Sequence, residues 1–178
     1  EIIFNTLLNM YPKGDKSLIE NNNKIILVPH EINEMKIRKL IARLNENHFS
    51  VQRYSLLKEK TFAANIIIID CVGILADLYK YAYLAYVGGG FTRGVHSILE
   101  PGIHGCAVSF GPYIETLDEL QDIYNLDLGI MINNYQEMVK VLQIPKEKLK
   151  QMGNNLRQFI TDKKNSADKS LKAIEGQL

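Results

Sequence analysis

The sequence of 178 residues contains no tryptophan and only two cysteines, Cys71 and Cys106. The two cysteines lack CxxC spacing and are too few for a disulfide framework, a pattern typical of a reducing compartment. An excess of either charge is also missing, because 21 Lys and Arg residues face 20 Asp and Glu residues and leave a net charge of +1. This balance gives no general attraction to nucleic acid or to an anionic membrane.

Long hydrophobic runs are missing as well. Apolar runs such as Ile66–Ile69 are far shorter than the ~20 residues that a membrane-spanning helix needs, and Ile66–Ile69 is typical of a buried strand. A secretory signal is not apparent, and the chain begins without Met, close to an apolar run at Ile2–Leu8 that we expect to be a first strand. We therefore expect residues 1–178 to form one soluble domain cut from a longer protein.

What the sequence does contain is an alternation of short apolar runs with segments of helical period. Further strands are expected at 24–29, 50–55, 65–70, 83–87, 106–110 and 128–132. Helices are expected at 15–22, 31–46, 73–82, 97–105, 116–124 and 135–164 and from 167 onward, and those after residue 145 should close the domain. Strands that are apolar on both faces and separated by helices predict a doubly wound, Rossmann-like α/β fold, a parallel sheet with helices on both faces.

Ligands of such folds bind beyond the carboxyl ends of the parallel strands. The loops that leave those ends are 29–31, 71–73, 88–96 and 111–113, and they hold most of the residues suited to chemistry. Asp70, at the end of a buried strand, is compatible with a functional role or with satisfying loop N–H groups. The sequence therefore predicts a ligand site at this edge of the sheet.

Four glycines, Gly88, Gly89, Gly90 and Gly94, lie within seven residues directly before an expected helix. Glycine lets backbone N–H groups approach an anion closely, so a phosphate is the expected ligand. The alternative is a tight turn that needs positive φ angles and holds no ligand. Four glycines exceed the needs of one turn, which favours the ligand, but the spacing is neither GxGxxG nor the P-loop pattern.

The residues after the glycines have two explanations each. Ser97 and Glu100 have the spacing of a capping box, and Glu100 is equally suited to accept hydrogen bonds from a ribose diol. His30 and His96 follow strands and are placed to donate to a phosphate or a sugar. His104, two residues before Cys106, raises the question of a metal site, but the spacing matches no zinc pattern.

The order VPHE, then DCVGILADLYKYAYLAYVGGGFTRGVHSILEPGIHGCAVSFGP, resembles the C-terminal half of the 3-deoxy-D-manno-octulosonic acid (Kdo) transferases, in the style of their Bacteroidetes branch. The resemblance extends from about Lys24 to Pro112 and implies a GT-B glycosyltransferase, built from two Rossmann-like halves. The sequence departs from the family's usual pattern at His30, where many members have Arg, and at Ser97, where the usual residue is Asn.

The resemblance also implies roles for individual residues. Pro29 and His30 would approach the cytidine of the donor, and Val72 and Gly73 would line the nucleotide loop. The remaining residues would surround the phosphate, the sugar and the ribose, with Glu100 taking the ribose hydroxyls: Gly89, Gly90, Phe91, Gly94, His96, Ser97 and Glu100. No metal or other cofactor is expected, and the catalytic base is expected in an N-terminal half outside this chain.

The function that the resemblance implies is the binding of CMP-Kdo, the donor from which Kdo passes to a lipid A precursor in lipopolysaccharide biosynthesis. The chain alone would be inactive, and the full protein would work at the cytoplasmic face of the inner membrane, with no nucleic-acid partner. The alternatives are half of another GT-B enzyme, a UDP-sugar transferase or a sugar-nucleotide epimerase, or a non-catalytic nucleotide-binding module.

Overall fold

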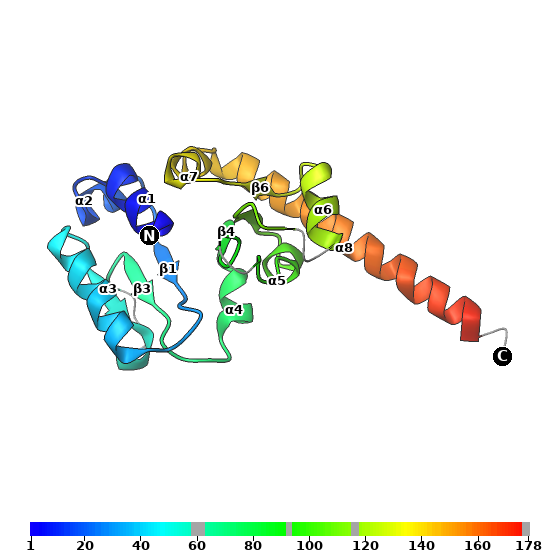
Figure 1. The fold of residues 1–178 in the computed structure, drawn as a ribbon, viewed down its shortest axis with the longest axis horizontal. Coiled ribbons are helices and arrows are strands. Elements are labelled where there is room, and N and C mark those ends of the chain that lie inside the picture. The colour runs from blue at the N-terminus through cyan, green and yellow to red at the C-terminus, as the bar shows by residue number, and fades with distance from the viewer. Residues whose placement is uncertain (58–62, 92–93, 115–117, 176–178) are drawn as a thin grey trace. The chain divides into compact units, whose positions relative to one another are not determined.

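The computed structural model describes residues 1–57, 63–91, 94–114 and 118–175, and the chain divides into two compact units, Glu1–Leu75 and Ala76–Leu178. The elements follow one another along the chain as Figure 1 shows. In the first unit they are α1 (Ile2–Met10), α2 (Asp15–Glu20), β1 (Ile25–Leu27), α3 (Glu34–Glu46), β2 (Val51–Arg53), the 3-10 turn η1 (Tyr54–Leu56) and β3 (Ile66–Ile68).

The first unit is built on a three-stranded parallel sheet with the order β1-β3-β2. Its central strand, β3, is buried along its whole length, as the apolar run at Ile66–Ile69 predicts. Helix α3 places Ile37 and Leu44 in the core, and their spacing of seven residues puts both on the same face of the helix. Asn33 caps this helix, since its side chain accepts a hydrogen bond from the backbone N–H of Lys36 at 3.0 Å.

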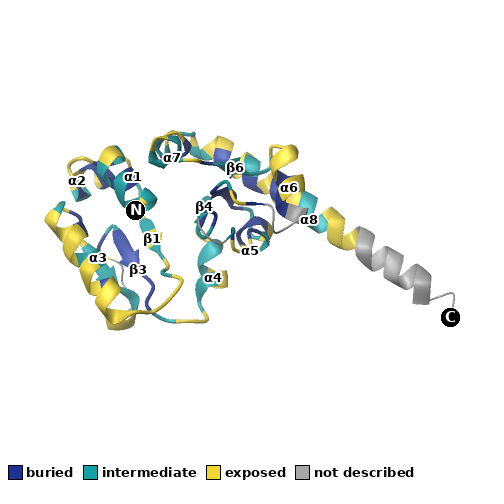
Figure 2. Ribbon diagram, viewed as in Figure 1, coloured by how far each residue is buried: buried dark blue, intermediate teal, exposed yellow. Residues whose placement is uncertain are grey.

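The second unit contains β4 (Leu84–Val87), β5 (Ala107–Phe110) and β6 (Ile130–Met131), which form a second parallel sheet with the order β4-β5-β6. Its helices are α4 (Leu75–Tyr79, whose first residue belongs to the first unit), α5 (Leu99–Ile103), α6 (Asp118–Asn125), α7 (Tyr135–Leu142) and α8 (Lys146–Glu175). Strand β5 is fully buried, and Val108 and Phe110 pack in one cluster with Leu156 of α8. Figure 2 colours the buried residues dark blue, with those of β3 among them.

The α/β class, the parallel strand pairing and the Rossmann-like alternation are thus confirmed. Within the described residues, however, the strands form two three-stranded sheets rather than one continuous sheet. The expectation of a single domain over 1–178, cut from a longer protein, stays a prediction.

The expected strand at Ile2–Leu8 is wrong, because these residues form helix α1. Leu7 and Thr6 are buried, Thr6 Oγ1 donates to the carbonyl of Ile2 at 2.9 Å, and the Arg43 guanidinium of α3 lies 3.9 Å from the centre of the Phe4 ring. The run holds Asn5 and Thr6 in its middle and is too short for its period to distinguish a strand from a helix.

The closing helices also differ from expectation. The predicted helix at 135–164 is interrupted between α7 and α8, where Pro145 disfavours helical geometry at the residue before it. The predicted break at 164–167 is wrong, since the backbone of α8 remains helical from Lys146 to Glu175. Glycine is rare in such a helix, and Gly153 is present because α8 lies against the turn at Gly105.

Candidate functional site

The glycine turn, defined here as Gly88, Gly89, Gly90 and Gly94, follows strand β4 in the second unit. Gly89 has φ +94°, and a Cβ there would lie 2.2 Å from the carbonyl oxygen of Gly94. Gly94 also has a positive φ, of 96°. A side chain at either position would strain the backbone, so the turn itself requires these two glycines.

The third glycine of the turn is required by a close approach of two loops. A Cβ at Gly90 would lie 2.8 Å from both the Cα and the N atom of Gly111, which follows β5. The backbone N–H of Tyr113 donates to the carbonyl of Gly90 at 3.0 Å, and that of Val95 donates to the carbonyl of Tyr113 at 3.3 Å. The loops after β4 and β5 therefore meet, as predicted for loops that leave the carboxyl ends of neighbouring parallel strands.

Gly88 is the remaining member of the turn, and the described structure gives no packing reason for it. No described atom lies within 4 Å of the place where its Cβ would stand, and its φ is not positive. Its carbonyl accepts a hydrogen bond from the backbone N–H of His96 at 3.2 Å. The inference that the glycines exceed the needs of a turn thus holds for Gly88 alone, a residue that the sequence-based set of site residues left out.

The capping box predicted for Ser97 and Glu100 does not form. Helix α5 begins at Leu99, with Ile98 in place of Ser97 as its N-cap and no side-chain capping bond. Pro101 does not interrupt the helix, because it lies in the first turn, where a missing N–H costs no hydrogen bond. With only five residues, α5 has a small dipole, so backbone N–H groups of the turn are the better anion donors.

Glu100 is exposed, and its carboxylate accepts no hydrogen bond within the described part of the chain. Its charge is felt by Tyr79, whose pKa is raised first by burial and then by the charges of Glu100 and Cys106. With the capping explanation removed, the carboxylate of Glu100 is available to a ligand. Ser97 and His96 are likewise exposed, and Phe91 is half-buried.

His104 and Cys106, two residues apart in the sequence, pack in separate surroundings. The His104 ring is stacked on Tyr79 with 6.3 Å between the ring centroids, whereas the buried Cys106 thiol lies 3.3 Å from the carbonyl oxygens of Tyr79 and Ala82. Burial raises the pKa of Cys106 to about 11, so its thiol stays protonated. Among the described residues, no three His, Cys, Asp or Glu side chains are grouped to hold a metal ion.

In the first unit, the other candidate residues leave two paired strands. Pro29 and His30 follow β1, and Val72 and Gly73 follow β3, which pairs with β1 in parallel. The Val72 side chain is 85% exposed, and Gly73 has φ +90° with no described atom within 4 Å of a Cβ placed there. The structure brings these loops to the same end of one sheet, while a joint site with the glycine turn stays a prediction.

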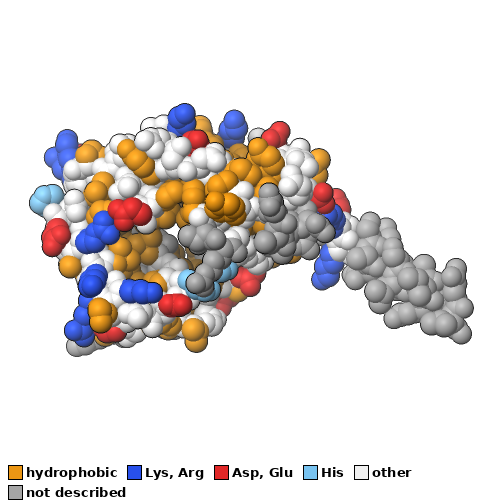
Figure 3. All heavy atoms as spheres, in the orientation of Figure 1, with side chains coloured by type: hydrophobic (Ala, Val, Ile, Leu, Met, Phe, Trp, Pro, Cys, Tyr) orange, Lys and Arg blue, Asp and Glu red, His pale blue; other side chains and the backbone are white. Residues whose placement is uncertain are grey.

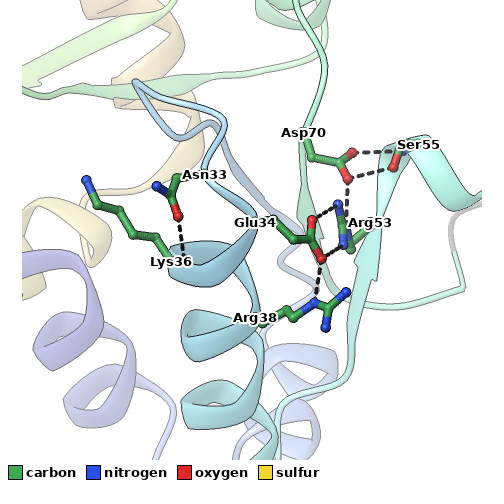
Figure 4. Close-up of polar contacts among 7 residues, drawn as sticks. All are labelled: Asn33, Glu34, Lys36, Arg38, Arg53, Ser55 and Asp70. Atoms are coloured by element: carbon green, nitrogen blue, oxygen red, sulfur yellow. Dashed lines mark hydrogen bonds and ion pairs between the residues drawn. The ribbon is translucent and has the colours of Figure 1, made fainter.

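A charged network at this end of the sheet was missed by the sequence analysis (Figure 4). Asp70 accepts hydrogen bonds from Arg53 Nε at 2.6 Å, from Ser55 Oγ at 2.6 Å and from the backbone N–H of Ser55 at 2.8 Å. Arg53 also donates to both carboxylate oxygens of Glu34, at 2.9 and 2.8 Å. The signal was a charged residue at or just after the end of each of two adjacent strands, Arg53 in the half-buried β2 and Asp70 after the buried β3.

The network shifts the pKa of each of its charged members. Burial alone would raise the pKa of Asp70, but the hydrogen bonds from Ser55 and Arg53 outweigh burial and lower it. Hydrogen bonds from Arg53 and Arg38 lower the pKa of Glu34. In turn, the hydrogen bonds that Arg53 donates to Glu34 and Asp70 raise the pKa of Arg53. All three residues are therefore charged at neutral pH.

The surface carries no large region of one charge on the face seen in Figure 3, where blue and red side chains are interspersed. Ion pairs among the described residues include Lys36 with Glu31 and Arg43 with Glu1. No helix of the described ranges combines the length and the hydropathy needed to cross a membrane.

Comparison with known proteins assigns the family. The chain is 35% identical to the 3-deoxy-D-manno-octulosonic acid transferase of Chlamydophila psittaci over 128 residues, 70% of this chain and 28% of that protein. It is 32% identical to the same enzyme of Aquifex aeolicus over 130 residues, 70% of this chain and 35% of that protein. The chain belongs to the Kdo transferase family.

Other comparisons agree with this membership in the Kdo transferase family. A bifunctional glycosyltransferase/methyltransferase of Fusobacterium nucleatum is 34% identical over 127 residues, 68% of this chain and 19% of that protein. The chain thus spans between 19% and 35% of the length of these relatives. No protein-family profile matches the chain.

The fold of this chain matches that of a solved domain. The crystal structure of the C-terminal CMP-Kdo binding domain of WaaA from Acinetobacter baumannii superposes with a TM-score of 0.60, covering 88% of this chain and 98% of that one. The sequence identity is 13%, so this likeness concerns the fold. It confirms the expected architecture of a GT-B C-terminal half.

Proposed function

We propose that the chain is the donor-binding half of a glycosyltransferase that transfers Kdo from CMP-Kdo to a lipid A precursor. The observation that carries the proposal is the 35% identity to a Kdo transferase over 70% of the chain. The solved domain with the same fold is a CMP-Kdo binding domain, which supports CMP-Kdo as the donor. The exposed Glu100 carboxylate and the open backbone at Gly88 supply groups suited to a nucleotide.

The residue roles follow the chemistry of each loop. In the first unit, Pro29 and His30 contact the cytidine part of the donor, and Val72 and Gly73 line the nucleotide loop. In the second unit, backbone N–H groups of the glycine turn, with Phe91, His96 and Ser97, surround the phosphate and the sugar. Glu100 accepts hydrogen bonds from the ribose hydroxyls, a role in which a carboxylate is the strongest acceptor available.

The reaction needs little from this half beyond binding and charge stabilisation. A hydroxyl of the acceptor forms a bond to the anomeric carbon of Kdo, the bond from that carbon to the CMP phosphate breaks, and CMP leaves with the electron pair. The hydroxyl proton passes to a base that we place outside this chain. Neutral N–H donors stabilise the charge that develops on a single phosphate, so the proposal includes no metal.

The acceptor and the location belong to the proposal as well. The lipid A precursor is bound by parts of the protein outside this chain, and the full protein meets the cytoplasmic face of the inner membrane through those parts. Nucleic acid is not a proposed partner, because the net charge of +1 offers no electrostatic footprint for it.

Calorimetric titration of the chain with CMP tests the proposal, with UDP and NAD as parallel ligands. We expect CMP to bind selectively, also in the presence of EDTA, and Glu100→Ala to weaken it by about 1–3 kcal/mol through the loss of charge-assisted hydrogen bonds. Glu46→Ala, which removes an exposed carboxylate at the end of α3, is the matched control and should bind CMP as the parent chain does. A preference for UDP would move the donor to another sugar nucleotide, and binding of no nucleotide by a folded sample would contradict the proposal.

A further inference from the structure

The network around Asp70 joins three elements at the carboxyl end of the first sheet (Figure 4). Arg53 is the last residue of β2, Asp70 follows β3 by two residues, and Glu34 is the first residue of α3. Arg53 connects the two acids, since its Nε donates to Asp70 and its two terminal nitrogens donate to Glu34. Removing the Arg53 fork would therefore separate the end of β3 from the start of α3.

Both loops proposed to contact the nucleotide in this unit are anchored at members of the network. The loop with Val72 and Gly73 begins directly after Asp70, and the loop with Pro29 and His30 ends at α3, whose first residue is Glu34. Val72 is 85% exposed, and no described atom lies within 4 Å of a Cβ at Gly73. Such a loop is supported chiefly at its ends, and Asp70 is one of them.

The cost of disturbing Asp70 is high because its side chain is fully shielded from water. The side chain has 0% exposed area, and the Arg53 side chain has 20%. A buried carboxylate needs all of its hydrogen bonds, and a buried charge left without its partner costs far more than an exposed one. Asp70 and Arg53 are therefore held in a fixed relation to each other at the ends of the two loops.

We propose that Asp70 and Arg53 are positioning residues for nucleotide binding, because their ion pair fixes the loops that carry Pro29, His30, Val72 and Gly73 in the arrangement that the cytosine base requires. This inference rests on the proposed function, in which those loops contact the base. Neither residue touches the donor. Their effect reaches it through the loop backbone, so they govern the choice between cytosine and uracil as well as the affinity.

The test measures the affinity of the full chain for CMP and for UMP in a series of variants: Ser55→Ala, Arg53→Lys and Asp70→Asn. Ser55→Ala removes one hydrogen bond to Asp70. Arg53→Lys keeps the positive charge but loses the simultaneous hydrogen bonds to Asp70 and Glu34. Asp70→Asn replaces one carboxylate oxygen by an NH2 group, which then faces the N–H and O–H donors of Arg53 and Ser55. Asp122→Asn, at an exposed carboxylate of α6 paired with Lys163, is the matched control. Near-ultraviolet circular dichroism verifies that each sample is folded at the temperature used.

We expect the dissociation constant for CMP to rise in the order of the series, by about tenfold or more for Arg53→Lys, and the ratio of UMP to CMP dissociation constants to fall toward one. The Asp122→Asn control should keep the parent values. Equal weakening of both nucleotides would show a merely structural role and would overturn the proposal, as would unchanged binding of both. If Asp70→Asn does not fold, Ser55→Ala and Arg53→Lys decide the question.

Amide hydrogen exchange without nucleotide separates this inference from the proposed function. The amides of His30 and Val72 should exchange faster in Arg53→Lys than in the parent, while those of β5 are unchanged. Failure of the parent chain to bind CMP would refute the proposed function, and faster loop exchange in the variant would then still support the ordering role of the network. Unchanged loop exchange would overturn that role whatever CMP does.

Discussion

Gly88 and Gly89 are adjacent in the sequence but stand in different surroundings. A Cβ at Gly89 would lie 2.2 Å from the Gly94 carbonyl oxygen at a φ of +94°, whereas no described atom is within 4 Å of a Cβ at Gly88. One of these glycines is thus required by the fold, and the other is free to serve a ligand. A pair of alanine substitutions distinguishes the two roles.

We expect Gly89→Ala to lower the free energy of unfolding by about 1–3 kcal/mol, the usual cost of a residue held in a strained backbone conformation. Gly88→Ala should change it by less than about 0.5 kcal/mol, as an open surface position does, and should instead weaken CMP binding, because a methyl group blocks the backbone. Urea unfolding and calorimetry measure the two quantities. A Gly88→Ala variant that binds CMP as tightly as the parent would place the phosphate elsewhere.

The glycines of the candidate site can be picked out in the sequence, but the structural reason for each of them cannot. The sequence shows four glycines within seven residues. Only the close approach to Gly111 reveals that packing requires a glycine at position 90. In the same way, the capping box at Ser97 fits the sequence pattern and does not form, because α5 begins at Leu99. Such contacts join residues distant in the chain, which local patterns do not encode.

Among the secondary-structure elements, helix α8 packs closely at Gly153 against the turn that precedes β5. A Cβ at this position would lie 2.0 Å from the carbonyl oxygen of Gly105 and 2.7 Å from the carbonyl carbon of Cys106. The helix therefore approaches the turn before β5 at backbone distance. Gly102 of α5 makes the complementary approach, because a Cβ there would meet Leu156 and Ile160 of α8.

We expect Gly153→Ala to destabilise the second unit by about 1–3 kcal/mol, the range for overpacking a filled interior. Alanine is the better helix former by roughly 1 kcal/mol, so a net loss would show that the contact with Gly105 outweighs helix propensity. Gln151→Ala, at an exposed position of the same helix, is the control and should be neutral or slightly stabilising. A Gly153→Ala variant as stable as this control would contradict the close approach.

At the scale of the whole molecule, several buried groups link stability to alkaline pH. Burial raises the pKa of Cys106 from 9.0 to about 11, and burial also raises the pKa values of Tyr83 and Tyr86. In the unfolded chain these groups lose their protons at lower pH. The folded state then holds more protons than the unfolded state, so stability must fall as pH rises.

The free energy of unfolding should therefore decline from pH 9 to pH 11, with the contribution of Cys106 fully present below the lower value. Urea unfolding at a series of pH values across this range measures the decline. Cys106→Ala should flatten it in part, because the substitution removes the thiol whose pKa burial raises. An identical slope for Cys106→Ala and the parent would exclude Cys106 as a source of the effect.

The α/β class, the buried strands β3 and β5 and the family were readable from contiguous residues, because an apolar run and a long glycine-rich string are local properties. The helix at Ile2–Met10, the strand orders β1-β3-β2 and β4-β5-β6 and the link that Arg53 makes between Asp70 and Glu34 became known from the fold alone. The physical reason is the same in each case. These features depend on contacts between segments far apart in the chain, and neither local period nor composition specifies which segments meet.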